Sequence, residues 1–141
     1  MKLDRRLRDE FRKFGPYFGS FNNPIDLTGM ATDESYYEAV RLAMEEDEIP
    51  SIITIYCQTA NTDPTLIASK IIKAITEMKP KTRKPIVFAG IGGVEVEKTI
   101  RRLDEAGIPA YRTPEEAVSA MAALMRYHRA KRRLKLVLGK V

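Results

Sequence analysis

The sequence predicts an α/β protein of three layers, in which helices cover both faces of a parallel sheet. Two observations support this prediction. The apolar runs Ile52–Cys57 and Pro85–Ala89 are rich in β-branched residues, as is typical of strands buried on both faces. Helical patterns alternate with the strand-like runs, and strands joined by helices usually pair in parallel. The length of 141 residues suits one domain of this class.

The N-terminal part is predicted to form a helix, a connector and a short strand. Apolar residues recur there every three or four positions, as on one face of a helix: Leu3, Leu7, Phe11 and Phe14. Gly15-Pro16 ends this helix, and the aromatic segment YFGSFNN is interpreted as an irregular connector. Asn23-Pro24 then leads into a short strand at Ile25–Thr28.

Two helices in the middle of the chain have clear start signals. Thr32 or Asp33 caps a helix over roughly Glu34–Glu46. Asp63 or Thr62 caps the next helix, which has Pro64 in its first turn. The second helix is expected to bury an apolar face made of Leu66, Ile67, Ile71, Ala74, Ile75 and Met78.

The C-terminal part repeats this arrangement. A helix is predicted from Val94 to Ala106 with Gly107 as its C-cap, followed by a short strand at Ile108–Tyr111. The segment Thr113–Glu116 has the pattern of a capping box and opens a helix with apolar residues at Val118, Met121, Leu124 and Met125. The last segment, LKLVLGKV, fits a helix or a final strand equally well.

The positive net charge is concentrated at the two ends. Met1–Phe14 carries six basic and three acidic residues, and Arg126–Val141 carries seven basic residues and no acid. The part in between has 11 basic and 16 acidic residues and is therefore acidic. We predict three regions: 1–22, an amphipathic helix and connector; 23–128, the α/β domain; and 129–141, a basic tail. A solvated helix end is the preferred interpretation of this tail, ahead of a nucleic-acid contact.

Several classes of site are excluded by composition. One histidine and one cysteine cannot make a zinc site, and we predict no metal site and no catalytic residue. His128 lies in the basic tail, and Cys57 has no histidine near it in the sequence to activate it. The single cysteine, the lack of a membrane-length apolar run and the lack of a signal sequence predict a cytoplasmic protein. Frequent Lys, Arg and Glu favour a thermophilic source.

Polar or glycine-containing turns follow the predicted strands and lead into helices. They are LTGMATD, CQTANTD, AGIGG and the Arg112-Thr113 junction. In a parallel sheet these turns share the carboxyl edge, where free amides favour a phosphate or a carboxylate. Asp26 either turns into such a site or bonds a loop amide.

Four segments, in order, resemble the NDP-forming acyl-CoA synthetases, which are relatives of succinyl-CoA synthetase and include the archaeal ADP-forming acetyl-CoA synthetases. The segments are NPIDLTGMATDESYYEAV, IITIYCQTANTDP, KPIVFAGIGG and RRLDEAGIPAYRTPEEAVSAMAALMRY. The resemblance implies a flavodoxin-like ligase domain near the C-terminal end of the α subunit. It further implies loops that face a phosphohistidine and acid-substrate site, with Thr28, Gly29, Gln58, Thr59, Ala60, Gly92 and Gly93 as candidates.

The implied reaction converts acyl-CoA, ADP and phosphate into acid, CoA and ATP. CoA, ADP or ATP, and Mg are implied for the complete enzyme, whereas we expect this chain alone to bind none of them. We expect its partner to be a chain carrying the CoA-binding and ATP-grasp domains, or a second copy, and we expect neither a membrane nor a nucleic-acid partner. Whether the chain is an enzyme by itself is left open. The alternative is a non-catalytic α/β module that regulates or scaffolds through protein contact.

The resemblance also predicts that the fold is incomplete. The sequence has no segment like the family's phosphohistidine motif, and it lacks the first strand, glycine turn and helix of this domain. In flavodoxin-like order that strand lies between the second and third strands. Ile25–Thr28 and Ile52–Cys57 should then flank a slot, filled by another chain or by LKLVLGKV.

Overall fold

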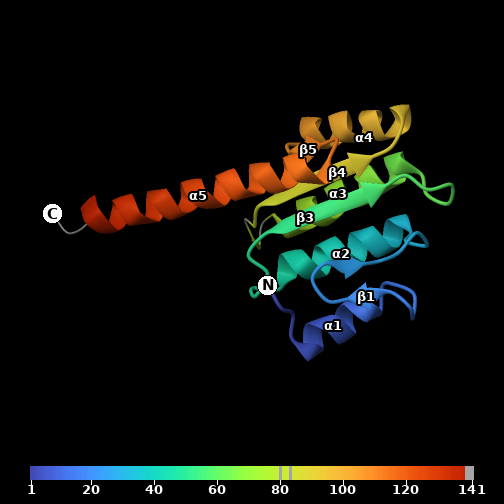
Figure 1. Ribbon diagram of the computed structural model, residues 1–141, viewed down its shortest axis with the longest axis horizontal. Coiled ribbons are helices and arrows are strands. Elements are labelled where there is room, and N and C mark those ends of the chain that lie inside the picture. The colour runs from blue at the N-terminus through green and yellow to red at the C-terminus, as the bar shows by residue number, and fades with distance from the viewer. Residues whose placement is uncertain (80, 83, 139–141) are drawn as a thin grey trace.

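The computed structural model describes residues 1–79, 81–82 and 84–138, and it shows a parallel sheet with helices on both faces (Figure 1). Three strands pair in the order β3-β4-β5, with bounds Ile52–Cys57, Ile86–Ile91 and Ala110–Tyr111. Both pairings are parallel, and Ile52 lies opposite Ile86. The predicted α/β class with a parallel sheet is therefore confirmed.

Four helices surround this sheet. Helices α2 (Asp33–Glu45), α3 (Pro64–Met78) and α4 (Val94–Glu105) lie side by side on one face. Helix α5 (Pro114–Leu138) covers part of the other face, where Ala117 and Met121 pack on Val87 and Ala89 of β4. The predicted caps form: Thr32 and Asp63 accept hydrogen bonds from Ser35 N–H and Thr65 N–H.

The N-terminal part folds against α2 rather than against the sheet. Helix α1 (Arg5–Arg12) buries Leu7 and Phe11 in the main core, as the apolar spacing predicts. Two short strands, β1 (Ser20–Phe21) and β2 (Ile25–Asp26), form an antiparallel hairpin next to it. The interpretation of YFGSFNN as an irregular connector is wrong, because Ser20 and Phe21 pair with Asp26 and Ile25.

The predicted strand Ile25–Thr28 is shorter than expected. It ends at Asp26, and Thr28 has a φ of 67°, a left-handed conformation that no strand tolerates. Asp26 Oδ1 accepts a hydrogen bond from Thr28 N–H at 2.8 Å. Of the two roles left open for Asp26, the structure shows the bond to a loop amide.

Helix α5 continues far beyond the predicted domain end. It runs back past the amino ends of the strands, and its C-terminal half projects from the body as an arm (Figure 1). LKLVLGKV is helical through Leu138, and 139–141 lie outside the described residues. The arm points away from the sheet, so the described part of LKLVLGKV does not fill the predicted slot.

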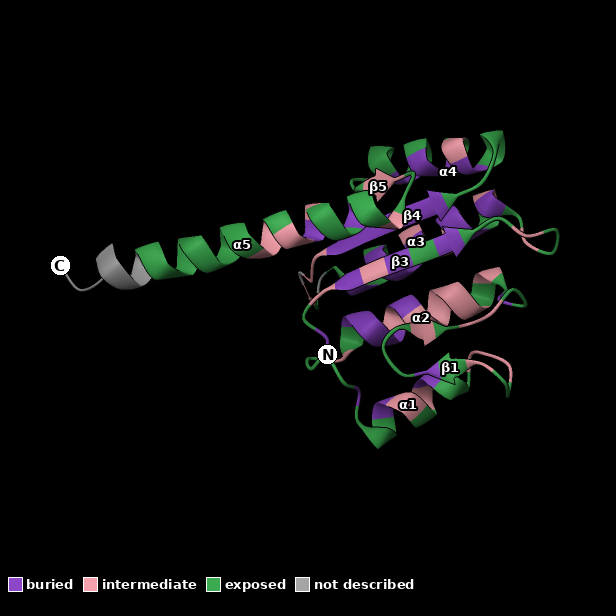
Figure 2. Cartoon of the chain, in the orientation of Figure 1, coloured by how far each residue is buried: buried purple, intermediate pink, exposed green. Residues whose placement is uncertain are grey.

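One residue expected on a buried helix face is exposed. Leu66 leaves 51% of its surface accessible, as does Val118, an apolar position of the helical pattern in α5. Figure 2 shows the contrast between the buried strands and the exposed outer surfaces of the helices. Periodicity identifies an apolar face, but it does not show whether a neighbouring element covers every residue of it.

Candidate functional site

The turns that follow β3 and β4 are joined by one side chain. Gln58 Oε1 accepts a hydrogen bond from Gly93 N–H at 2.9 Å, and Gln58 N–H donates to Ile91 O at 2.8 Å. These residues are 35 positions apart in the sequence, and the parallel pairing of β3 with β4 brings them to the same edge. Because its oxygen is engaged, the Gln58 side chain is oriented with its NH₂ group available as a donor.

Gly92 is required by the close approach of these turns. A Cβ atom there would lie 2.5 Å from Val96 Cγ2 and 2.6 Å from Gln58 Oε1, which real side chains do not allow. A Cβ on Gly93 would fit without a clash, because its nearest neighbour would be Gln58 Oε1 at 3.8 Å, an ordinary van der Waals contact. Gly93 is the N-cap of α4, so the amides of the first turn of α4 start at this point.

The other predicted site residues gather at the end of β3 that faces the hairpin. Gly29 lies beside Thr59, since a Cβ on Gly29 would be 4.0 Å from Thr59 Cγ2. The Thr59 hydroxyl is hydrogen-bonded to Thr62 Oγ1 at 3.1 Å, and Thr62 Oγ1 lies 2.7 Å from the hydroxyl of buried Tyr56. Thr28 and Gly29 therefore lie near the turn after β3, although β2 pairs only with β1 and is not a strand of the parallel sheet.

The predicted site residues thus form two separate groups at the carboxyl edge rather than a single cluster. Thr28, Gly29 and Thr59 line the end of a groove, whereas Gln58, Gly92 and Gly93 lie one strand further along. Ala60 is exposed in the same loop as Gln58, and no contact links it to either group.

The electrostatics of the α4 terminus are mixed. The first turn of α4 contains Glu95 and Glu97, which already complement the positive end of the helix. Each acid has a cationic neighbour: Lys98 Nζ is 2.7 Å from Glu95 Oε1, and an Arg112 nitrogen is 3.5 Å from Glu97 Oε1. Arg112 follows β5, so the turn after the third strand also reaches this edge.

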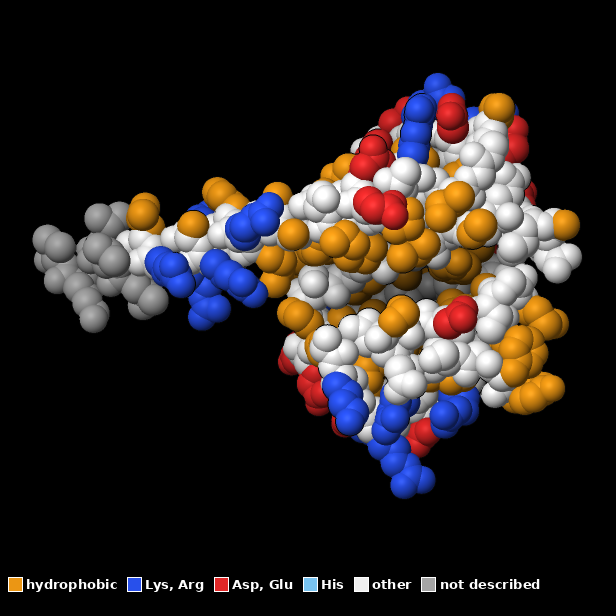
Figure 3. Space-filling model, in the orientation of Figure 1, with side chains coloured by type: hydrophobic (Ala, Val, Ile, Leu, Met, Phe, Trp, Pro, Cys, Tyr) orange, Lys and Arg blue, Asp and Glu red, His pale blue; other side chains and the backbone are white. Residues whose placement is uncertain are grey.

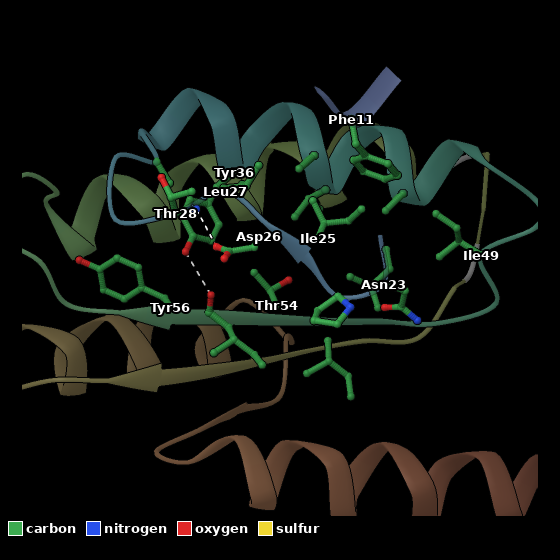
Figure 4. A pocket seen from close by; sticks show the side chains of 18 of the residues that line it. Phe11, Asn23, Ile25, Asp26, Leu27, Thr28, Tyr36, Ile49, Thr54 and Tyr56 are labelled. Carbon is green, nitrogen blue, oxygen red and sulfur yellow. Dashed lines mark hydrogen bonds between the residues drawn. The ribbon is translucent and has the colours of Figure 1, made fainter. Parts of the chain in front are cut away.

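A groove lies between the hairpin and the sheet, with a volume of about 930 Å³ (Figure 4). Residues of β2 form one wall and residues of β3 form the other, while Tyr36, Ala39, Val40 and Ala43 of α2 close the side between them. The space-filling view shows the molecule hollowed there, with apolar side chains along the rim (Figure 3). β2 and β3 do not pair, so the predicted open slot between them is present.

Tyr36 is a polar group in this groove that the sequence did not single out. Its hydroxyl donates a hydrogen bond to Ile55 O at 3.1 Å, and its ring meets the Tyr56 ring edge-on at 6.1 Å. Burial raises the pKa of Tyr36 to about 12. Helical spacing places Tyr36 on an inner face, but it gives no sign that the hydroxyl reaches a strand carbonyl.

The described residues contain no cluster of His, Cys, Asp and Glu side chains that could hold a metal ion. His128 is exposed on the arm of α5, away from the carboxyl edge. Within the described part of the chain, no helix is both long enough and apolar enough to cross a bilayer. The carboxyl edge offers hydrogen-bond donors, and the free thiol of Cys57, the last residue of β3, is exposed there.

A parallel sheet covered by helices on both faces, with glycine and threonine turns at its carboxyl edge, places the chain among the flavodoxin-like α/β domains. Residues 1–135 match the Ligase-CoA domain, and the chain belongs to that family. This match supports the resemblance to the NDP-forming acyl-CoA synthetases.

Curated relatives and solved structures agree with this assignment. The chain is 45% identical over 121 residues to the α subunit of an ADP-forming acetate–CoA ligase, isoenzyme I, of Pyrococcus furiosus, covering 86% of this chain and 26% of that subunit. It is 30% identical over 125 residues to the isoenzyme II α subunit of the same organism, covering 87% of this chain and 27% of that subunit. The acetyl-coenzyme A synthetase 1 of Ca. Korarchaeum cryptofilum, solved in complex with phosphate and ADP, superposes with a TM-score of 0.86 at 43% identity, covering 92% of this chain and 27% of that one.

The chain therefore spans about a quarter of the length of these relatives. It matches one segment of each of these longer chains, and the comparisons do not favour the regulatory or scaffolding alternative. The archaeal sources of these relatives agree with the thermophilic composition.

Proposed function

We propose that this chain supplies one wall of an anion-binding site in an ADP-forming acyl-CoA ligase. Other domains of the ligase would complete that site. The observation that supports this proposal is the link between Gln58 Oε1 and Gly93 N–H, which holds two of the predicted turns together. The close packing at Gly92 fixes that arrangement without any bound ligand. Preorganised donors of this kind stabilise charge without making or breaking bonds.

The roles proposed for the individual residues follow from their free groups. The Gln58 NH₂ group and the amides at the start of α4 would donate to a phosphate or carboxylate oxygen. Gly93 N–H is engaged by Gln58, so Gly93 acts by orienting that side chain. Thr28, Gly29, Thr59 and Ala60 would form a second stretch of the same wall.

CoA, ADP or ATP, and Mg fit this chain only in part. The carboxyl edge has amide and hydroxyl donors suited to phosphate, but the described residues offer no cluster of carboxylates for a metal. We therefore place the binding of nucleotide, metal and CoA on partner domains, whether these belong to a separate chain or to a longer form of this one. In this role the chain binds and orients an anionic group but forms no covalent bond to it.

Reconstitution tests this function directly. The Pyrococcus furiosus α subunit would be shortened by the segment that this chain matches, combined with its partner subunit, and assayed for ATP formation from acetyl-CoA, ADP and phosphate. Adding this chain should restore ATP formation. A Gln58→Leu variant should restore much less, and Asn61→Leu, in the same exposed loop, should act like the unchanged sequence.

Two outcomes would contradict the proposal. A folded chain that joins the complex but restores no ATP formation would support a role in protein contact alone. Equal activity of the Gln58→Leu and unchanged chains would remove the carboxyl edge from the anion site.

A further inference from the structure

The projecting arm of α5 exposes a narrow line of apolar side chains. Four residues recur there at spacings of four, three and four, as at the core positions of a coiled coil: Ala123, Tyr127, Ala130 and Leu134. Tyr127 and Leu134 are 60% and 64% exposed, and both alanines are exposed as well. These four residues are referred to as the seam. In Figure 2 the outer part of α5 extends beyond the other described elements.

The seam is a different face of α5 from the one that packs on the sheet. Ala117 and Met121 form the packed face, against β4. Because successive residues of a helix are 100° apart, Tyr127 lies about 120° around the helix from Met121. The contacts with the sheet therefore do not explain why the apolar spacing continues along the arm.

A shallow recess follows the seam. It has a volume of about 300 Å³, and it is lined by Tyr127, Ala130, Lys131 and Leu134. Lys131 Nζ lies 5.9 Å from the centre of the Tyr127 ring, so the aliphatic stem of this lysine borders the recess. The small Ala130 leaves room between the two larger side chains. An apolar side chain of a second helix can insert at such a place, as a knob into a hole.

Cations border the seam on both sides. In a heptad with Tyr127 at position a, Lys131 occupies position e, and Arg126 and Arg133 occupy position g. Residues at e and g lie directly beside the core of a helix pair. Within the described part of the chain, none of these three cations forms an ion pair. The borders of the seam thus favour a partner with acidic residues.

We propose that the seam docks an amphipathic helix of a partner protein, whose own apolar stripe is bordered by glutamate or aspartate. The apolar side chains of the two helices interlock along the recess, and the acids of the partner pair with Arg126, Lys131 and Arg133. This proposal does not depend on the proposed function, because the arm extends past the amino ends of the strands, away from the carboxyl edge.

The arm gains stability from such a partner. Only the first half of α5 rests on the sheet, and a short helix without tertiary contacts is marginal in water. Arg129 and Arg133 are one turn apart, and like charges at this spacing oppose the helix. A helix with acidic borders offsets the repulsion and buries the seam at the same time.

A second copy of the arm does not fit these borders. In a parallel pair, Arg126 of one arm would face Lys131 of the other. In an antiparallel pair, Arg126 would face Arg133, and the two copies of Lys131 would face each other. Every border contact would join like charges, which disfavours pairing of two arms.

The shape of the seam also distinguishes a helix from other anionic partners. A helix that lies on a lipid surface has a broad face of large apolar side chains. The seam has two large side chains separated by alanine, and cations close to both sides (Figure 3). Nucleic acid would use the cations but would leave the seam exposed to water. A helix uses both features.

The probe is a synthetic helical peptide of three heptads with leucine at a and d and glutamate at e and g. It carries a fluorescent label, and its anisotropy is followed while the full chain is added in about 0.15 M salt, where charges far from the contact are largely screened. We expect saturable binding of this peptide. A control peptide with lysine at e and g should bind at least about tenfold more weakly.

Two double variants with the same change in net charge locate the contact. Lys131→Glu with Arg133→Glu reverses the charge beside the seam and should weaken binding by at least about tenfold. Arg129→Glu with Arg132→Glu reverses the charge on the opposite side of the arm and should weaken it by less than about threefold. Circular dichroism of both variants checks that α5 stays helical.

The apolar part of the contact has its own variant. Tyr127→Ala with Leu134→Ala leaves every charge in place, and it should weaken binding of the acidic peptide by at least about tenfold because the recess loses both of its large side chains. Unchanged binding in this variant would overturn the proposal.

Four further outcomes would overturn the proposal. The first is absence of binding at millimolar concentrations of the unchanged chain. The second is equal weakening by the two charge-reversed double variants, which would show attraction between net charges alone. The third is binding of duplex DNA or phosphatidylglycerol vesicles under conditions in which the peptide does not bind. The fourth is doubling of the mass of the free chain in solution, abolished by Tyr127→Ala with Leu134→Ala, which would assign the seam to a second copy.

Discussion

Strands β3 and β4 have the same length and similar composition, yet their surroundings differ. β4 has a strand on each side and buries five of its six residues, whereas β3 has one neighbouring strand and leaves Ile55 and Cys57 exposed. Both sequences are apolar and β-branched enough for a central position. β3 therefore has the apolar composition of an inner strand, although it lies at the edge of the sheet in this chain.

The largest expected effect concerns two isoleucines, one on each strand. Ile86→Ala on β4 should lower the free energy of unfolding by about 2–5 kcal/mol, because Ile86 is 9% exposed in the core. Ile55→Ala on β3 should cost less than about 1 kcal/mol, because that side chain is 47% exposed. Urea unfolding of both variants measures the difference. Equal losses would show that Ile55 is covered in solution.

A second pair of variants tests the turn that follows β4. Gly92→Ala should lower the free energy of unfolding by about 1–3 kcal/mol, since the added methyl group collides with Val96 and Gln58. Gly93→Ala should change the free energy of unfolding by less than about 1 kcal/mol, because the added Cβ would make only an ordinary contact with Gln58 Oε1 at 3.8 Å. Thermal unfolding of the two variants under one buffer provides the check. If both alanines are tolerated equally, the two turns are not locked together.

The hydrogen bond from the Tyr36 hydroxyl to Ile55 O of β3 should contribute about 1 kcal/mol to the free energy of unfolding. Tyr36→Phe should remove this contribution. The pKa of Tyr36 is raised from 10.0 to about 12 in the folded state, so the neutral phenol is favoured by folding. This contribution is fully present below pH 10 and is lost as the pH rises from 10 toward 12. Between pH 10 and pH 12 the free energy of unfolding should fall less steeply for Tyr36→Phe than for the unchanged protein.

Tyr37→Phe is the matched control for the alkaline experiment. The Tyr37 hydroxyl donates to Glu77 Oε2 at 2.6 Å on the helix surface, and this bond raises the pKa of Tyr37 in the same direction. The Tyr37 contact should contribute less to the free energy of unfolding than the Tyr36 contact, because the Tyr37–Glu77 hydrogen bond is exposed to solvent. A larger alkaline effect for Tyr37→Phe than for Tyr36→Phe would contradict the burial of Tyr36 in the groove.

The smallest expected effect is a gain in stability. The Thr54 hydroxyl on β3 is buried and has no hydrogen-bond partner among the described residues. Thr54→Val keeps the shape and removes this unsatisfied group, so it should raise the free energy of unfolding by about 0.5–1 kcal/mol. The same measurement on Thr99→Val, the corresponding case in α4, should give a gain of similar size. A loss in Thr54→Val alone would mean that the β3 hydroxyl has a partner in solution.

Local signals predicted most of the elements in the fold. The β-branched run predicts the bounds of β3, Ile52–Cys57, and Asp63 caps α3 as expected, because strand propensity and capping act within a few positions. The short strand at Ser20–Phe21 was missed because only its pairing with β2 makes it a strand. The prediction that Leu66 is buried is wrong because an apolar pattern does not reveal which part of a helix a neighbouring element covers.

The candidate site was less predictable than the fold. The approach of Gly29 to Thr59 depends on how the β1-β2 hairpin packs beside β3, because β2 is not a strand of the parallel sheet. The bond between Gln58 and Gly93 depends on side-chain orientation across 35 positions, which no local pattern encodes. The assignment of these residues to an anion site remains a prediction.

The long α5 helix gives the molecule an asymmetric charge distribution. At 1.5 Å per residue its 25 residues extend about 37 Å, and the exposed stretch Arg126–Arg133 sets five cations on the projecting half. The segment between the two basic ends has an excess of acids and forms most of the body, so the arm is cationic and the part of the body built by that segment is acidic. Such a permanent dipole turns an approaching charged partner before the surfaces touch, and it raises the association rate most strongly at low ionic strength.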